Sequence, residues 1–304
     1  MRNAYISTLY ELAKQDLRVM ALIGDNGIIV YDKFRADMPQ QFLNMGISEA
    51  HMVGFAAGLA AEGKIPFVYT IGVFLTGRAY EFIKNLVCFH HLNVKLVGTG
   101  SGQVYSRLGA THHATEDLGC LRSLSHLTVI SPASPLEVKK AVRAAYELAS
   151  PVYLRLGTSK EAEIYDGHYD FTIGQGVLLR EGKDVTLIGT GIILKDVLNV
   201  AKDLTQEGIH ARVINIHTLI PLDENIIRQA IEETGKIITV EDHNVIGGLG
   251  SAVAEVVAEY GQPIRFKRMG LRDYSFGYGS YDEVKAVNGI GVDTIKKAVR
   301  EIVH

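Results

Sequence analysis

Several residue types that mark specialised protein classes are scarce in this 304-residue chain. It has two cysteines, Cys88 and Cys120, and no tryptophan, so we expect neither a disulfide framework nor a cysteine-based metal cluster. The 31 basic residues are nearly balanced by 34 acidic ones, which argues against nucleic acid or an anionic membrane as the principal partner. No uncharged apolar run approaches the ~18 residues needed to cross a bilayer, and the N-terminal MRNAYISTLYELAKQD lacks the apolar stretch of a signal peptide. We therefore expect a cytoplasmic enzyme or enzyme subunit without a metal site of its own.

Short β-branched runs alternate with amphipathic helical patterns along the chain, which is typical of parallel α/β architecture. The length is about twice that of a usual domain. We predict an α/β protein of two doubly wound parallel-sheet domains, residues 1–160 and 177–304, joined by a polar, glycine-containing linker at 161–176. Strands are expected at 19–24, 42–46, 65–70, 93–99, 128–132, 151–157, 184–191, 211–217, 236–242 and 263–270. The main helices are expected at 5–15, 48–63, 76–90, 135–149, 223–234, after 250 and at the C-terminal end.

The most distinctive local pattern is GISEAHMVGFAAGLA, which begins at Gly46. A predicted strand ends at Gly46, Ser48 is a suitable N-cap, and Glu49 falls in the first turn of a helix rich in Gly and Ala. Such a helix permits close packing or the close approach of a ligand. An acidic residue at this place often does no more than complement the helix dipole, so the pattern alone leaves the role of Glu49 open.

Five further segments give this pattern a context. VYTIGVFLTGRAYEFIKN (68–85) and GATHHATEDLGCLRSLSHLTVISPAS (109–134) follow it, and GTGIIL, ARVINIHTLIPLDE and TVEDHNVIGGLGSAVAE occur in the second half. Together they resemble the pyrimidine-binding and C-terminal domains of transketolases, particularly the separately encoded C-terminal halves of split transketolases. The turn at 247–250 does not match a dinucleotide fingerprint, because Val253 stands where a third glycine is required.

The resemblance implies thiamine diphosphate as the cofactor. Glu49 matches the glutamate that hydrogen-bonds N1′ of the cofactor's aminopyrimidine. Phe74 is expected to stack on that ring, although its pattern fits an ordinary core residue equally well, and Asp25 matches an acidic position near the cofactor that also suits a plain turn. His112 matches a histidine that faces the substrate channel, and it is the second catalytic candidate after Glu49. His113 replaces a family glutamine, with a consequence that the sequence does not reveal.

The family's motif for Mg²⁺ and the diphosphate, Gly-Asp-Gly with a downstream Asn, has no counterpart here. The run from Gly24 to Gly27, GDNG, has a different third residue and lies in the other domain. The resemblance therefore implies that a partner, an N-terminal transketolase subunit, binds Mg²⁺ and the diphosphate. We expect an α2β2 assembly with the cofactor between the two kinds of chain.

The segments that contact the far end of the sugar differ from the family pattern. Arg2 is retained, and Arg155 is a nearby substrate-binding candidate. Arg107 brings a cation into the loop before His112, where it would suit an anion such as a sulfonate, or where it is simply a solvated loop residue. Four positions that are polar or charged in the family are occupied here by other residues, namely Gly100, Leu108, Thr158 and Ile29. Either the alignment slips by a residue or two in these loops, or the end group is a sulfonate, a carboxylate or an uncharged terminus.

The activity implied is transfer of a two-carbon glycolaldehyde unit from a ketose to an aldose. Three alternatives stay open at this point. One is the β subunit of a 2-oxoacid dehydrogenase decarboxylase, and another is an enzyme making 1-deoxyxylulose 5-phosphate. The third is a non-catalytic scaffold subunit, against which the presence of Glu49 argues.

Overall fold

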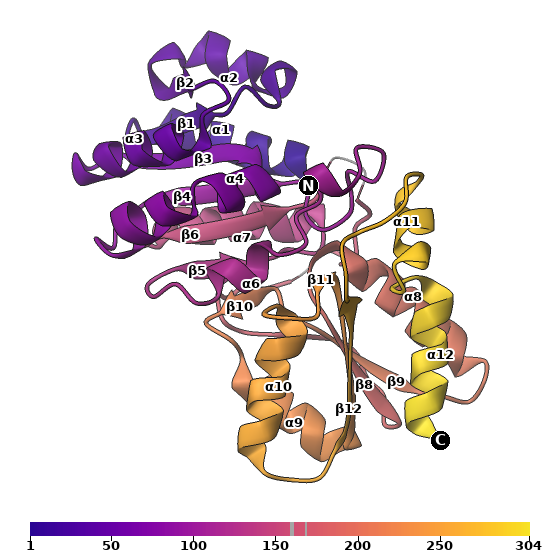
Figure 1. Cartoon of the computed structure of the whole chain (residues 1–304). Coiled ribbons are helices and arrows are strands. Elements are labelled where there is room, and N and C mark those ends of the chain that lie inside the picture. The colour runs from indigo at the N-terminus through magenta and orange to yellow at the C-terminus, as the bar shows by residue number, and fades with distance from the viewer. Residues whose placement is uncertain (159–160, 168) are drawn as a thin grey trace.

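A computed structural model describes residues 1–158, 161–167 and 169–304 (Figure 1). Two sheets, each covered by helices, lie one above the other in the view of Figure 1. This confirms the predicted α/β architecture with two sheets. None of the helices in the described ranges is both long and apolar enough to pass through a membrane.

The first sheet has seven strands in the order β10-β5-β6-β4-β3-β1-β2, in which β10 (Thr218–Ile220) comes from the second half and the first-half strands are parallel. These are β1 (Val19–Ile23), β2 (Phe42–Asn44), β3 (Ile65–Ile71), β4 (Lys95–Thr99), β5 (Thr128–Ile130) and β6 (Val152–Leu156). The central strands are buried on both faces, which explains their nearly continuous apolar sequences. One face is covered by α1 (Arg2–Gln15) and α7 (Pro135–Glu147), and the other by α3 (Glu49–Ala61) and α4 (Gly72–Arg78).

The second sheet has five strands in the order β12-β11-β8-β9-β7, with β7 antiparallel to β9. The strands are β7 (Val177–Arg180), β8 (Val185–Gly189), β9 (Ala211–Asn215), β11 (Lys236–Asn244) and β12 (Arg265–Leu271). The helices α8 (Leu194–Thr205) and α12 (Val292–Val303) pack on one face, with α11 (Tyr281–Val287) beside them. The other face carries α9 (Glu224–Thr234) and α10 (Leu249–Tyr260).

Two local features go beyond the predictions. The segment expected to be helical at 76–90 is helical, but it is divided into the end of α4, the short α5 (Tyr80–Phe82) and a π-helical segment η3 (Ile83–Cys88); such π segments occur often near functional sites. The second half also contributes β10 (Thr218–Ile220), which pairs antiparallel with β5 at the edge of the first sheet. Its pairing partner lies about ninety residues earlier in the chain, so local sequence patterns could not reveal it.

The two halves share a buried interior. One apolar cluster runs from β3 and α3 through α6 (Asp117–Leu121) to α9 and α10. The segment expected to be a linker takes part in this junction, because the hydroxyls of Tyr165 and Tyr169 both donate to Oε1 of the buried Glu137, each at 2.8 Å. The described part of that segment therefore packs against the body of the protein.

Candidate active site

Glu49 is the first residue of α3, as the sequence pattern predicted, and its side chain is only 2% exposed. The chain turns into the helix through Gly46, whose φ is +70°, a conformation that favours glycine. Ser48 holds the N-cap position but its hydroxyl caps no backbone N–H. The carboxylate instead accepts a hydrogen bond from Nη1 of Arg78, with 3.0 Å between Nη1 and Oε2.

Arg78 connects Glu49 to two other predicted site residues. It lies four residues after Phe74 on α4, so the two side chains occupy one face of that helix. The guanidinium carbon is 4.3 Å from the centroid of the Phe74 ring, and that ring meets His112 edge-on with 5.2 Å between centroids. The structure therefore brings Glu49, Phe74 and His112 into one continuous cluster, with Arg78 as its link.

Sequence reasoning missed Arg78 as a site residue. The signal was present, because Phe74 and Arg78 have helical i,i+4 spacing within the segment that carries the family resemblance. Only the structure shows that the guanidinium turns towards Glu49 on α3.

Asp25 lies beside the turn that leads to Glu49. Its φ is +53°, and its exposed side chain accepts from Nδ2 of Asn44 at 2.9 Å. The Asn44 side-chain oxygen accepts in turn from the backbone N–H groups of Asp25 and Gly46. The carboxyl ends of β1 and β2 are thus tied together, at the edge of the sheet where ligands usually bind in α/β folds.

Arg2 and Asp25 line a common hollow of about 480 Å³, together with residues 26–30. Two nitrogens of its lining residues are buried without a hydrogen-bond partner among the described residues: Nε of Arg2 and Nδ2 of Asn26. Both can donate a hydrogen bond. Ile29, at the mouth, is 84% exposed. The hollow therefore suits a ligand group rich in acceptor oxygens.

Arg155 does not lie where a substrate could reach it, so its expected substrate-binding role needs correction. Its side chain is 2% exposed and its Nε donates to Oδ2 of Asp117 at 2.8 Å. Nη2 donates to the carbonyls of Ala114 and Asp242 at 2.8 and 3.0 Å. Burial alone would raise the pKa of Asp117, but the charge of Arg155 holds that pKa below its ordinary value. Arg155 joins the two halves of the chain.

The loop that carries Arg107 and the His112–His113 pair is held by the C-terminal half. Nδ1 of the buried His113 is 2.8 Å from Oγ of Ser275, and burial lowers the pKa of this histidine. The Ser106 hydroxyl donates to the Gly279 carbonyl at 2.8 Å. His113 is thus a structural contact between the halves, while the neighbouring His112 is partly exposed at the cluster and Arg107 is exposed.

A second buried network explains the glycine-rich turn at 247–250. Backbone N–H groups of Leu249 and Gly250 donate to the carboxylate of Glu241 at 2.7 and 2.8 Å, and burial raises the pKa of Glu241 to about 7. An added Cβ on Gly248 would lie 2.0 Å from Oε2 of Glu241. The glycines let the start of α10 close over this carboxylate, in agreement with the prediction of a tight turn.

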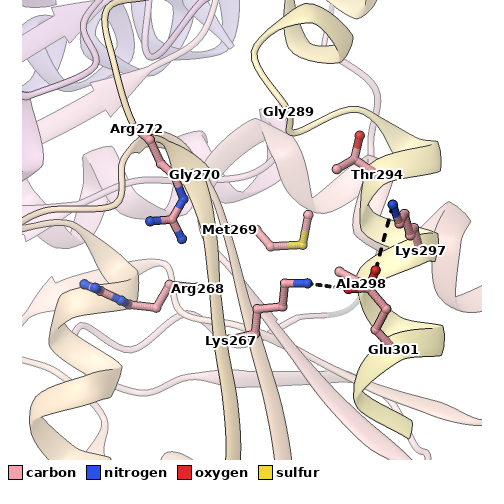
Figure 2. Close-up of a pocket in the computed structure, with 10 residues that line it drawn as sticks. All are labelled: Lys267, Arg268, Met269, Gly270, Arg272, Gly289, Thr294, Lys297, Ala298 and Glu301. Atoms are coloured by element: carbon pink, nitrogen blue, oxygen red, sulfur yellow. Dashed lines mark hydrogen bonds and ion pairs between the residues drawn. The ribbon is translucent and has the colours of Figure 1, made fainter. Parts of the chain in front are cut away.

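Another hollow, of about 240 Å³, lies between β12 and α12 (Figure 2). It contains none of the predicted site residues. Lys267 and Lys297 both face Glu301, at 2.8 and 3.9 Å, but Glu301 is the one acidic residue among the described residues of the lining, which therefore stays net positive. The Arg268 side chain points away from the hollow (Figure 2) and donates to the Val245 carbonyl.

Known proteins are similar to this chain over nearly its whole length. Residues 1–161 match the model of the transketolase pyrimidine binding domain, and residues 174–295 match that of the transketolase C-terminal domain. The chain is 36% identical to the 6-deoxy-6-sulfo-D-fructose transketolase subunit SqwH of Clostridium sp. (strain MSTE9), over 99% of this chain and 94% of that one. It is also 36% identical to an apulose-4-phosphate transketolase subunit of Actinobacillus succinogenes, over 97% of this chain and 96% of that one.

A solved structure described as a split gene transketolase, inactive beta4 tetramer, superposes with a TM-score of 0.92 at 39% identity. The match covers 99% of this chain and 97% of that one. The two family models together span most of the sequence. The relatives at this level of identity and the common fold indicate the same family. The chain belongs to the transketolase family.

Proposed function

We propose that this chain is the C-terminal subunit of a split transketolase. It transfers a two-carbon glycolaldehyde unit from a ketose to an aldose with thiamine diphosphate and Mg²⁺. The observation that carries the proposal is the cluster in which the buried carboxylate of Glu49 lies near the aromatic face of Phe74 and the ring of His112. The similar proteins named as transketolase subunits support transketolase chemistry over that of a 2-oxoacid dehydrogenase β subunit.

The residues present fit the pyrimidine end of the cofactor. A buried carboxylate at a helix start and a partly exposed aromatic ring are a hydrogen-bond acceptor and a stacking surface for a planar, nitrogen-containing ring. When bound, thiamine diphosphate supplies the carbon nucleophile, which is chemistry that no side chain provides. This chain's part is to hold and orient the group.

Each residue has a distinct task in this proposal. Glu49 shares a proton with N1′ of the aminopyrimidine, and its burial keeps water from competing for that contact. Phe74 fixes the plane of the ring. His112, partly exposed beside Phe74, faces the sugar and hydrogen-bonds it. Asp25, at the end of β1, is the proposed acidic contact near the cofactor, and it also lines the hollow that contains Arg2.

We propose further that the Mg²⁺ and diphosphate contacts come from an N-terminal subunit, in an α2β2 assembly. The similar split transketolase whose β4 tetramer is described as inactive supports dependence on a partner. So does the extent of the two relatives named as subunits, which this chain spans almost completely.

The far end of the sugar is proposed to carry a sulfonate or a similarly modified group. Arg2 lines a hollow whose unpartnered groups can donate hydrogen bonds, and Arg107 adds an exposed cation on the substrate loop. The name of the Clostridium relative supports a sulfonated sugar, and that of the Actinobacillus relative shows that phosphate must be tested beside it. Turnover with 6-sulfofructose, fructose 6-phosphate and fructose decides this. A preference for fructose 6-phosphate refutes the sulfonate assignment.

The experiment that tests the whole proposal replaces Glu49 by Gln in the reconstituted complex. We expect turnover to fall by about 10²–10⁴-fold, because a neutral amide cannot share the proton. Light scattering before the assay establishes that the mass of the complex is unchanged. Activity close to wild type in an intact complex would favour a scaffold subunit instead.

A further inference from the structure

The side chain of Arg78 contacts both groups that the proposed function assigns to the cofactor's aminopyrimidine. Nη1 donates to Oε2 of Glu49 at 3.0 Å, and the guanidinium carbon lies 4.3 Å from the centroid of the Phe74 ring. A guanidinium is planar, donates hydrogen bonds from its edge and stacks on aromatic faces. A protonated or amino-substituted pyrimidine presents the same combination of edge donors and flat face.

The exposure of the two partners is very unequal. The Glu49 side chain is 2% exposed, whereas the Arg78 side chain is 52% exposed. The carboxylate is therefore fixed in the interior, while the guanidinium has a path to solvent along the open side of α4. Arg78 is also the one side chain among the described residues that donates a hydrogen bond to this carboxylate.

A buried carboxylate without a partner is costly, because desolvation disfavours its charged form. Arg78 offsets that cost in the chain by itself. Once another donor reaches Glu49, the guanidinium is no longer required there and solvent can hydrate it. The contact between Arg78 and Glu49 is thus one that another hydrogen-bond donor can replace.

We propose that Arg78 is a latch on the cofactor site. It competes with the aminopyrimidine of thiamine diphosphate for Glu49 and Phe74, and it leaves both as the cofactor enters. This inference rests on the proposed function. It adds that loading requires displacement of a residue of this chain, so that the latch lowers the affinity and slows the entry of the cofactor.

The alternative is that Arg78 supports Glu49 throughout, remaining on the carboxylate when the cofactor is bound. The two cases predict opposite effects of removing the side chain. A latch, once removed, lets the cofactor bind more tightly; a permanent support, once removed, weakens cofactor binding.

The test measures thiamine diphosphate binding by calorimetry at fixed Mg²⁺ in the complex of this chain with its N-terminal subunit. Arg78→Ala is expected to tighten the dissociation constant by about tenfold, the combined worth of a half-exposed ion pair and a cation–π contact. Arg78→Lys keeps the charge but loses the planar stack, so it is expected to fall between Arg78→Ala and wild type. Arg143→Ala on the exposed face of α7 is the matched control and is expected to bind as wild type does. Thermal melting of each complex establishes that it is folded.

The outcomes separate the latch from the function on which it rests. If wild type binds thiamine diphosphate and Arg78→Ala binds it more weakly or equally well, the latch is refuted while the proposed function stands. If the folded wild-type complex does not bind thiamine diphosphate at all, the proposed function fails and the latch with it. Tighter binding by Arg78→Ala together with unchanged binding by Arg143→Ala supports the latch.

Discussion

Replacement of Arg155 by Met tests whether this residue holds the two halves of the chain together. Arg155 and Asp117 are 2% and 0% exposed, and the guanidinium donates to Asp117 on α6, to Ala114 and to Asp242 on β11. Without it, the buried carboxylate keeps the Tyr153 hydroxyl, at 2.7 Å, but loses its counter-ion. Breaking a buried pair in this way costs about 3–5 kcal/mol.

The assay is urea unfolding of the chain, followed by circular dichroism, for Arg155→Met, Asp117→Asn and the double variant. Each single variant is expected to lose about 3–5 kcal/mol of unfolding free energy, and the double variant less than the sum, because it leaves no charge buried alone. The difference in unfolding free energy between wild type and Arg155→Met is expected to become smaller as pH falls. Arg155 holds the pKa of Asp117 down against the opposing effect of burial, so without Arg155 that pKa rises and the carboxyl takes up a proton more readily.

Arg143→Met, which removes an exposed arginine from α7, is the control and is expected to stay within about 0.5 kcal/mol of wild type. The reasoning is refuted if Arg155→Met is as stable as this control. If turnover of that stable variant also fell through a raised KM, Arg155 would be a substrate-binding residue after all.

Two further predictions concern the same junction. His243 is buried, and its Nε2 accepts a hydrogen bond from the Gly119 N–H at 3.2 Å. Burial lowers the pKa of this histidine to about 4. Between about pH 6.5 and 4 the folded state therefore binds fewer protons than the unfolded state, so the folded state loses stability as pH falls through that range. From pH 7 to pH 5, the unfolding free energy of His243→Asn, measured in urea, is expected to fall by about 2 kcal/mol less than that of wild type. An equal fall in the two proteins would contradict the assigned pKa. Gly102 has φ +56°, and an added Cβ would lie 2.1 Å from Oδ2 of Asp242, so Gly102→Ala is expected to cost at least about 1–3 kcal/mol. Gly58→Ala is the matched control: it meets nothing within 4 Å on α3 and is expected to stabilise by about 0.5–1 kcal/mol. Similar melting temperatures for these two glycine variants would contradict the argument.

Glu49 shows what sequence could predict. Its place at the start of α3 follows from a local pattern, a strand that ends in glycine followed by a helix start, because helix signals act over a few residues. The fold was predictable for the same reason, since alternating strands and helices specify parallel sheets. Phe74 and His112 could be matched by resemblance, but only the structure shows that they touch.

Arg155 shows what sequence could not predict. Its partners Asp117 and Asp242 lie 38 and 87 residues away, and nothing in the run VYLRL says which way the arginine points. One warning was available, because an arginine within an otherwise apolar central strand must find its partners in the interior. The same limit applies to β10 and to the Arg78–Glu49 contact, which also join distant segments.

The contacts of the loop from Gln103 to His113 give the C-terminal half a part in the proposed site. The loop from Gln103 to His113 touches that half at both ends: the buried Gln103 and His113 both bond to Ser275. Gln103 N–H also donates to Asp242, at 2.9 Å, and the carbonyl of that residue is bound by Arg155. His112 is therefore positioned by contacts whose other members are in the second half of the chain. A C-terminal half that merely assembled subunits would not need them, so we expect changes at this junction to alter the sugar side of the site as well as stability.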